Sequence, residues 1–267
     1  MSRMAGKEKY WESFLLQLTS LLHYRWDFIV KWTILPFMAV IYYVLWQAVF
    51  ASNPAFGGYT FEFIYSYLFL ALLFRRAGSF FEEAWGVEQA IQKGDILVQI
   101  VRPINYLFYR LSLRTAYFVT LGLFFTPFVF LIPYLFLGHL PTLLNGVMVL
   151  ILVTLGYIAL FFLYHCIGMF SFWLGEISGV YTGIYFLSWL LSGAVIPISL
   201  LPSSVESLAF ALPFYHQSAA PALLYLNQLQ PGDFAQSFSI LSLWIIGLYF
   251  ARQYLWHHGL RHHDGKG

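Results

Sequence analysis

Few side chains in this sequence could take part in chemistry within its long apolar stretches. Asp27 and Glu62 lie near the ends of two such stretches, and His165 and Glu176 lie near the end of another. Secondary transporters and proton pumps usually need acids, bases or ion-binding groups at membrane depth. The sequence also contains no GxxxxGK[ST] phosphate loop and no HExxH, GxSxG or CxxC motif. We therefore expect no catalytic residues, no metal site and no cofactor bound by this chain.

Two other features could bind a cation. His257, His258, His262 and His263 are close together near the C-terminus, and neutral imidazoles bind metals well. A flexible cytoplasmic tail without a metal role is the interpretation we favour. Glu62 could hold a cation near the far side of a membrane, although a solvated or hydrogen-bonded acid is the simpler interpretation.

The composition identifies the class of protein. Of the 267 residues, 60% are hydrophobic, 21% are aromatic and only 10% are charged. A soluble domain has about 25% charged residues, so this chain must be an integral membrane protein. One helical span needs about 20 apolar residues, so the length suits about six spans with short loops. The net charge of +2 gives no reason to expect nucleic acid, and the single Cys166 excludes an internal disulfide.

The basic residues predict the topology. All fourteen Lys and Arg residues lie in three zones, and none occurs in 32–74 or 115–251. Basic residues that flank spans stay in the cytoplasm. We therefore expect both termini and the 75–114 segment to face the cytoplasm, and each gap must hold an even number of spans.

Hydropathy and turn residues place the elements. Residues 8–26 predict an amphipathic helix that either lies in the membrane interface or simply leads into the first span. Arg75 and Arg76, at the end of the second span, are expected to extend to the inner interface. The predicted spans are 32–51, 60 to about 81, 112–136, 143–170, 178–196 and 234–252.

The 197–233 segment does not fit a simple span. Its 207–226 portion is apolar but contains Pro213 and Pro221, and a full span there would put Arg252 outside. We expect short outer or re-entrant helices, which need protein or water around them. The chain shows no internal repeat and no second domain, so residues 1–267 are expected to form one all-α transmembrane domain.

The 82–105 segment is the only sizeable polar stretch within the chain. Val87 to Lys93 predicts a short helix, and Gly94 is suited to the left-handed residue that ends it. Asp95 can cap the residues after it, and Pro103 restricts Arg102 to an extended backbone. The result is a compact bend suited to docking a soluble partner. A solvated loop between two spans is the alternative that these residues leave open.

A family resemblance bears on this segment. Residues 91–105 (IQKGDILVQIVRPIN) resemble the I-x-x-G-x-L-x-x-x-L-x-R-P-x-N element of type-2 ABC exporter permeases, with Ile96 and Ile100 in place of the two Leu residues. Residues 191–202 (LSGAVIPISLLP) resemble the S-G-x-x-x-P-x-x-x-x-P end of the fifth span in that family. The N-terminal helix and six spans fit as well. The resemblance is narrower to a bacterial branch whose members are often encoded in pairs beside an ATPase.

The resemblance implies how the protein works. Two permeases, identical or paralogous, would pair in the bacterial inner membrane, and each would dock one ATP-binding subunit that holds ATP and Mg. The bend would lie at the ATPase surface, and the interfacial helix would help to transmit its motion. The implied coupling residues are Glu88, Lys93, Gly94, Asp95, Arg102 and Pro103.

Two further patterns have alternative interpretations. Ser171, Gly175, Gly179 and Gly183 recur every four residues, and such small residues let helices approach closely in lipid. They indicate either a permease–permease interface or packing within one subunit. A set of aromatic and basic side chains could line a substrate pathway, although ordinary packing or contact with lipid would also explain them: Tyr65, Phe69, Arg75, Arg76, Tyr181, Tyr185 and Trp189.

These observations favour one function over two others. The predicted function is a multi-pass permease subunit that exports a lipophilic or amphipathic substrate, such as a lipid, a drug-like metabolite or a lipid-linked glycan. It would not hydrolyse ATP itself. The alternative is a polytopic membrane scaffold or assembly factor without a transport cycle. A membrane enzyme is disfavoured because catalytic groups are not clustered.

Overall fold

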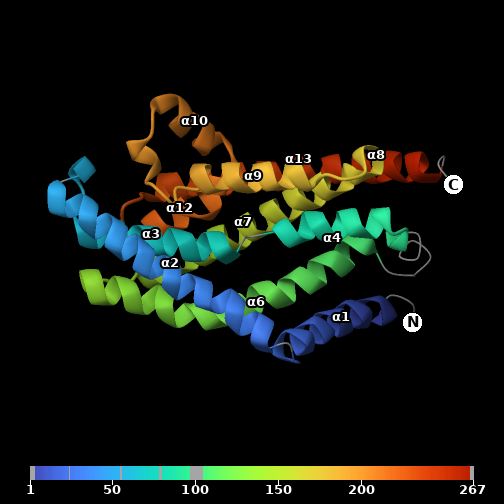
Figure 1. The fold of residues 1–267 in the computed structure, drawn as a ribbon, viewed down its shortest axis with the longest axis horizontal. Coiled ribbons are helices and arrows are strands. Elements are labelled where there is room, and N and C mark those ends of the chain that lie inside the picture. Colours follow the sequence, from blue (N-terminus) through green and yellow to red (C-terminus); the bar gives the residue numbers. More distant parts are fainter. Residues whose placement is uncertain (1–3, 24, 55, 78–79, 97–104, 265–267) are drawn as a thin grey trace.

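All regular elements in the described part of the chain are helices (Figure 1). The computed structural model describes residues 4–23, 25–54, 56–77, 80–96 and 105–264. The long helices are α1 (Met4–His23), α2 (Arg25–Ser52), α3 (Phe61–Ala77), α4 (Phe81–Gln92), α6 (Tyr106–Leu137), α7 (Leu143–Met169), α9 (Ser178–Leu191) and α13 (Pro231–Asp264). The short ones are η1 (Phe56–Gly58), α8 (Ser171–Leu174), η2 (Ile198–Leu200), α10 (Ser203–Ala211), α11 (Pro213–Gln217) and α12 (Ala219–Tyr225). The predicted all-α fold is therefore confirmed.

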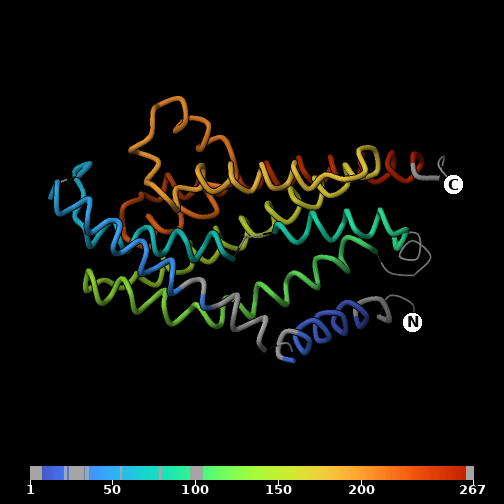
Figure 2. The backbone as a smooth tube through the Cα atoms, in the orientation of Figure 1, coloured from blue at the N-terminus to red at the C-terminus, as the bar shows by residue number. Residues whose placement is uncertain are grey.

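The long helices run along one axis of an elongated bundle (Figure 2). Helix α7 is central, because it packs against α13, α4, α11 and α12. Helix α6 packs against α1 and α3. The end of α13 and the start of α1 lie at one end of the bundle, and α10 lies toward the other (Figure 1). This arrangement agrees with an expected even number of crossings between the termini.

Three helices in the described residues are long and apolar enough to cross a membrane. They span Tyr106–Leu137, Leu143–Leu174 and Pro231–His262, and Pro36–Ser52 forms a shorter apolar helix within α2. Helix α3 has 17 residues and α9 has 14, which is fewer than the roughly 20 that a perpendicular span requires. The chain thus has membrane-spanning helices, and the six-span topology stays a prediction.

Glycines with a left-handed backbone lie where several elements end. Gly57 and Gly58 follow α2 with φ of +64° and +79°, and Gly138 ends α6 with φ of +60°. The Gly138 N–H donates to the carbonyl of Tyr134 at 2.9 Å. An L side chain is strained in this left-handed region, whereas glycine is not. The boundaries between 51 and 60 and between 137 and 143 therefore depend on local sequence.

The 197–233 segment forms short helices, as its prolines predicted. Helices α11 and α12 pack against α3 and α7. Ser218 donates its hydroxyl to the carbonyl of Ala71 at 2.8 Å, and the amide of Gln217 donates to the carbonyl of Phe74. At Gly156 a Cβ would lie 2.8 Å from the backbone of Gln217, so this glycine allows α11 to approach α7. The segment is bound firmly to the bundle.

The histidine-rich segment is helical, which corrects the expectation of a flexible tail. Helix α13 extends through Asp264, and His257 and His258 each place Nδ1 within 2.9 Å of the carbonyl four residues earlier. The helix continues through Gly259, which lies so close to the Phe172 ring of α8 that a Cβ there would be 2.3 Å from it. Among the described residues, no group of three or more His, Cys, Asp or Glu side chains could hold a metal ion.

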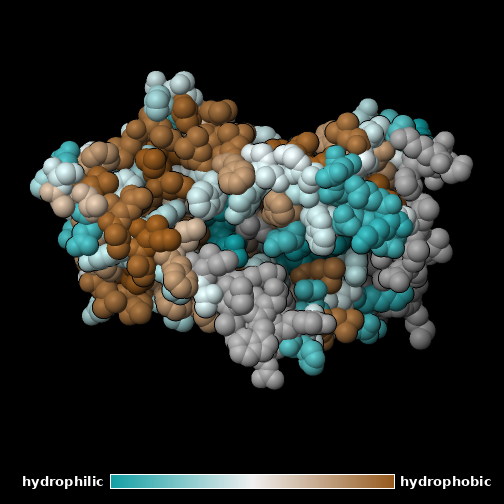
Figure 3. Space-filling view, viewed as in Figure 1, coloured by the Kyte–Doolittle hydropathy of each residue, from teal (hydrophilic) through white to brown (hydrophobic). Residues whose placement is uncertain are grey.

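Polarity divides one face of the molecule in two (Figure 3). Figure 3 shows apolar side chains gathered over the half of the molecule that carries α10, and more hydrophilic ones over the half near α4 and the termini. An apolar half suits the hydrocarbon region of a bilayer, where polar backbone must be satisfied internally. The hydrophilic half suits an aqueous compartment.

Candidate functional site

The polar segment after α3 forms a helix and a glycine bend. Helix α4 begins at Phe81, six residues before the predicted start, and ends at Gln92. Gly94 has φ of +74°, as predicted for the residue that ends this helix, and its N–H donates to the carbonyl of Ile91 at 3.2 Å. Lys93 and Asp95 are exposed on either side of it. The bend is therefore accessible to a partner.

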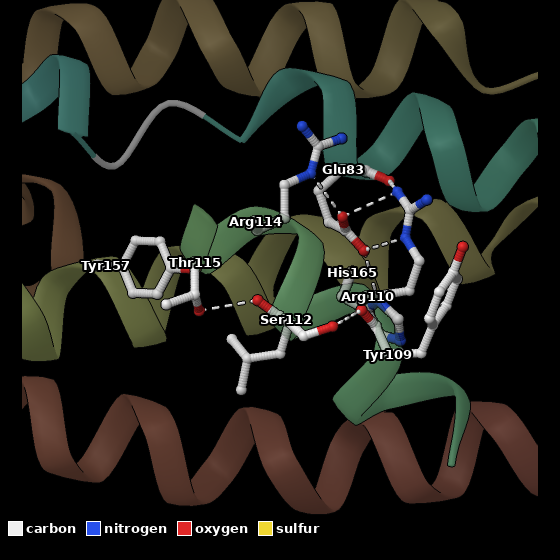
Figure 4. Close-up of polar contacts among 9 residues, drawn as sticks. Glu83, Tyr109, Arg110, Ser112, Arg114, Thr115, Tyr157 and His165 are labelled. Carbon is white, nitrogen blue, oxygen red and sulfur yellow. Dashed lines mark hydrogen bonds and ion pairs between the residues drawn. The ribbon is translucent and has the colours of Figure 1, made fainter. Parts of the chain in front are cut away.

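A buried ionic cluster fixes α4 to two long helices. Glu83 on α4 is completely buried, and its carboxylate accepts hydrogen bonds from three side chains (Figure 4). Arg110 binds both oxygens, with Nε 3.1 Å from Oε1 and Nη2 2.9 Å from Oε2. Arg114 Nε lies 2.9 Å from Oε2, and His165 Nδ1 lies 2.9 Å from Oε1. We call Glu83, Arg110, Arg114 and His165 the Glu83 cluster.

The charges of the Glu83 cluster keep the carboxylate ionised. Burial by itself raises the pKa of Glu83, but Arg110, the hydrogen bond from His165 and the charge of Arg114 outweigh it and hold the pKa well below its usual value. An ionised carboxylate can only accept hydrogen bonds, so His165 carries its proton on Nδ1. The bidentate geometry of Arg110 adds directional specificity. The cluster therefore ties α4 to α6 and α7 in one defined arrangement.

Two glycines bring the helices close enough for these contacts. A Cβ at Gly86 would lie 2.3 Å from Nη2 of Arg110. At Gly168, on α7, a Cβ would lie 2.6 Å from Cβ of Val87 and 2.8 Å from the carbonyl oxygen of Ala84. A side chain at Gly168 would push α4 away from α7, and one at Gly86 would displace the Arg110 side chain of α6. The absence of side chains here is thus part of how the sequence positions α4.

Asn105, the last residue of the family element, connects α6 with α1. Its side chain accepts a hydrogen bond from the N–H of Leu107 at 3.0 Å and so caps α6. Its own N–H donates to the hydroxyl of Tyr10 at 2.9 Å, and the Tyr10 ring packs edge-on against Phe108. Helix α1 also exposes Trp11 and Leu16. The N-terminal helix is therefore docked beside the end of the polar segment.

One predicted coupling residue lies in the wrong place for contact with a partner. Glu88 is only 2% exposed, and its Oε1 accepts a hydrogen bond from the N–H of Ile177 at 2.7 Å. Ile177 is the residue just before α9, so the Glu88 carboxylate accepts a hydrogen bond from an N–H that has no partner within the helix. The carboxylate also lies near the positive end of the helix dipole. The expectation that Glu88 meets charges on an ATPase is corrected to a structural role. Arg102 and Pro103 lie outside the described residues.

The sequence comparisons identify the family. Residues 37–267 match a family model described as ABC-2 family transporter protein. The chain belongs to the ABC-2 transporter family. A comparison with curated proteins found no match. Members of the family are the transmembrane components of ABC transporters, in which a separate subunit carries the ATPase activity. Together with the three long apolar helices, the match makes this a multi-pass membrane protein and a permease component.

The predicted pathway residues of this ABC-2 family member fall into two groups. Arg75 is buried, so it does not extend to the interface as expected. Its Cζ lies 4.9 Å from the ring centre of Tyr185 and 5.2 Å from that of Trp189, and its Nη2 donates to Ser188 at 3.4 Å. Ring contacts on α9 favour this burial. The adjoining cavity measures about 10 Å³, which is about the room for one water molecule.

The remaining aromatic residues do not pack on the Arg75 guanidinium, although Tyr181 and Tyr185 both contact the ring of Phe81. Tyr65 packs against Phe136 at 4.7 Å and against Phe69 at 6.3 Å, and Tyr181 packs against Phe81 at 4.8 Å. Arg76 is partly exposed. The structure does not bring the seven predicted residues into one open channel. In this conformation the substrate pathway stays a prediction.

The four small residues before and within α9 differ in burial. Ser171 is buried and donates its hydroxyl to the carbonyl of Gly168 at 2.8 Å. Gly175, Gly179 and Gly183 are exposed, and a Cβ at any of them would meet no described atom within 4 Å. Gly175 ends α8 with φ of +72°, a backbone that itself favours glycine. Packing within the described chain does not explain Gly179 and Gly183, which form an open stretch of α9 that a neighbouring helix could approach closely.

Sequence reasoning missed the central residue of the site. The sequence did not distinguish Glu83 from the other acids of the polar stretch, and Arg110 and Arg114 served only to predict the membrane topology. One signal was present: the two arginines are four residues apart, so they share one face of a helix whose other residues are mostly apolar. A pair of cations on a helix that enters a membrane needs an acidic partner.

Proposed function

We propose that the chain is the permease subunit of an ATP-driven exporter, and that α4 with the Gly94 bend receives the motion of the ATPase. The permease moves a lipophilic or amphipathic molecule out of the cytoplasm or the inner leaflet. The observation that carries the proposal is the attachment of α4 to α6 and α7 through the Glu83 cluster. Family membership supplies the ATPase partner.

The Glu83 cluster couples movement of α4 and the Gly94 bend to movement of α6 and α7. Lys93 and Asp95 present opposite charges beside the bend, where complementary charges on an ATP-binding subunit can set the register of docking. Displacement of the bend moves α4, and the cluster transmits that movement to α6 and α7 because its bonds are short and buried. Rigid-body rocking of two such permease subunits against each other alternates the access of the substrate to the two sides of the membrane.

The proposed complex contains two permeases and two ATP-binding subunits, with ATP and Mg bound by the latter. The exposed stretch of Gly179 and Gly183, with Gly175 before it, is the proposed contact with the second permease, identical or paralogous. Exposed Val180 and Phe186 on α9 add apolar area beside it. The bacterial inner membrane with both termini in the cytoplasm is the proposed location.

The test compares two glycines with similar backbones. Gly94 and Gly58 have φ of +74° and +79°, and a Cβ at either meets no described atom within 4 Å. In Gly94→Val and Gly58→Val the left-handed backbone costs roughly 1–2 kcal/mol. That cost reduces the population of the native bend about five- to thirtyfold. The two variants therefore impose similar strain at opposite ends of α3 and α4.

The measurement is ATP hydrolysis by the permease co-purified with an ATP-binding subunit of its own organism, in lipid nanodiscs. With whichever ATP-binding protein co-purifies with the permease, we expect Gly94→Val to lose most of the permease-dependent hydrolysis while membrane insertion survives, and Gly58→Val to keep it. Equal hydrolysis by both variants would show that the bend is not the coupling element. Failure of the wild-type chain to bind any ATP-binding protein would favour a scaffold instead.

A further inference from the structure

A second site lies far from the ionic cluster, between α3 and the short helices α10 to α12. A cavity of about 100 Å³ opens there. Its walls include aromatic rings from three helices and a loop, together with one carboxylate. The residues that matter are Tyr59, Phe63, Tyr67, Phe210, Tyr215 and Glu206. We call this space the aromatic cavity.

The rings of the aromatic cavity are held in place by contacts with each other and with the backbone. Tyr59, Phe63 and Tyr67 are four residues apart, and neighbouring rings are nearly parallel, at 5.3 Å and 6.4 Å between centres. Phe210 and Tyr215 meet edge-to-face at 4.7 Å. The Tyr67 hydroxyl donates to the carbonyl of Gly193 at 2.8 Å. A set of rings fixed in this way is organised before any ligand arrives.

The charge around the cavity has one sign. Glu206, in the first turn of α10, is the only carboxylate among the described lining residues. It forms no ion pair with any residue that the structure describes, and the sequence has no Lys or Arg in 32–74 or 115–251. Asp233 lies close enough to Tyr215 to act on it electrostatically. The cavity therefore offers negative charge and ring faces without a cation of its own.

We propose that the aromatic cavity binds an organic ammonium ion, either a protonated amine or a quaternary ammonium group. Aromatic rings attract such cations through the negative charge of their faces, and aromatic cages are the usual means of recognising quaternary ammonium groups. The size agrees, since an apolar cavity of about 150 Å³ takes benzene and 100 Å³ thus suits a group of roughly four or five heavy atoms. Calcium would need at least six oxygen ligands, which one carboxylate cannot supply.

This site goes beyond the proposed export function and does not depend on it. The ammonium group can belong to a small soluble amine or to the headgroup of a lipid, because the cavity recognises only the shared cation. The probe is choline, and its comparison compound is 3,3-dimethylbutan-1-ol, which has the same shape without the charge. Binding is measured by calorimetry on the full chain in nanodiscs of phosphatidylglycerol and a neutral glycolipid, neither of which carries an amine.

Matched variants identify the binding group. Glu206→Gln removes the charge that lines the cavity, and Glu62→Gln makes the same change on α3 at an exposed position that does not line it. Phe63→Leu removes one ring face and keeps an apolar side chain. We expect Glu206→Gln to weaken choline binding about tenfold and Phe63→Leu several-fold, as one screened charge and one ring contact would give. Glu62→Gln should change it less than twofold.

The outcomes separate the possibilities. Choline should bind and the uncharged alcohol should bind at least tenfold more weakly. Equal affinity for the two compounds, no binding of choline, or equal effects of Glu206→Gln and Glu62→Gln would overturn the proposal. A fall in choline affinity when phosphatidylcholine replaces the neutral glycolipid, at constant phosphatidylglycerol and thus constant surface charge, would identify a lipid headgroup as the occupant, and unchanged affinity would identify a soluble amine. The assay contains no ATPase, so a negative result leaves the coupling test unaffected.

Discussion

Replacement of Glu83 by glutamine tests whether the ionic cluster holds the helices together. The variant keeps the size of the side chain and one acceptor oxygen but removes the negative charge. Arg110 and Arg114 then face an uncharged amide, with only 14% and 21% of their side chains exposed. Two cations would be left without a counter-ion in a site that water reaches poorly.

The expected cost depends on the burial of the partners. Breaking a buried ion pair by removing one member costs roughly 3–5 kcal/mol, mostly because the other charge is left unpaired. Since the guanidinium groups are partly exposed, they regain some hydration, and we expect a loss of about 3 kcal/mol for Glu83→Gln. Arg110→Gln should be costly for the same reason. The double variant should cost less than the sum, since contacting residues are energetically coupled.

The free energy of unfolding is measured by denaturant titration in mixed micelles, with tryptophan fluorescence and circular dichroism as the two signals. Glu82→Gln is the control, because Glu82 lies next to Glu83 on α4 but forms no ion pair with any described residue. It should change stability by no more than about 0.5 kcal/mol. If Glu83→Gln and Glu82→Gln were equally stable, the cluster would not be what attaches α4 to α6 and α7.

Neighbouring contacts support three further predictions. Burial raises the pKa of Glu83, but Arg110, His165 and Arg114 together lower it by more, so the pKa in the folded protein lies below the ordinary value of 4.5. The contribution of the ionised carboxylate to stability is therefore complete above pH 4.5 and is lost as the pH falls below it. The difference in unfolding free energy between wild type and Glu83→Gln should be constant from pH 7 to 5 and shrink below pH 4.5. A constant difference down to pH 3 would contradict this. Gly168→Ala should cost about 1–3 kcal/mol by overpacking, measured in the same titration, whereas Gly146→Ala on the same helix, where a Cβ meets no described atom within 4 Å, should be neutral or stabilising. Glu88→Ala should speed amide exchange at the start of α9 more than Glu88→Gln does, because the amide oxygen of glutamine can still accept from Ile177; equal exchange in both variants and the wild type would exclude the capping role.

Local features of the chain were readable without a structure. The membrane class is evident from composition, and helices α6 and α7 begin and end within about six residues of the predicted 112–136 and 143–170. Gly94 adopts the left-handed backbone that was predicted for the residue ending the helix before it. Such features depend on a few consecutive residues, so a one-dimensional pattern is sufficient to find them.

The site depends on contacts between distant parts of the chain. Glu83 meets Arg110, Arg114 and His165 across 27, 31 and 82 residues. Nothing in the polarity of residues 82–105 distinguishes Glu83, which is buried, from Lys93, which is exposed. Arg75 was expected at the membrane interface because the polarity of a residue does not show whether its side chain is buried. Only the position of α9 beside Arg75 shows why it is buried.

The sequence alone determined that this is a helical membrane protein, because apolar length and basic clusters are properties of the chain itself, and its resemblance to ABC permeases rests on the motifs at residues 91–105 and 191–202. Tertiary structure decided which charges are surface groups and which are structural. A charged side chain can be buried only where other elements supply its counter-ions and hydrogen bonds, and those elements come together only when the helices pack.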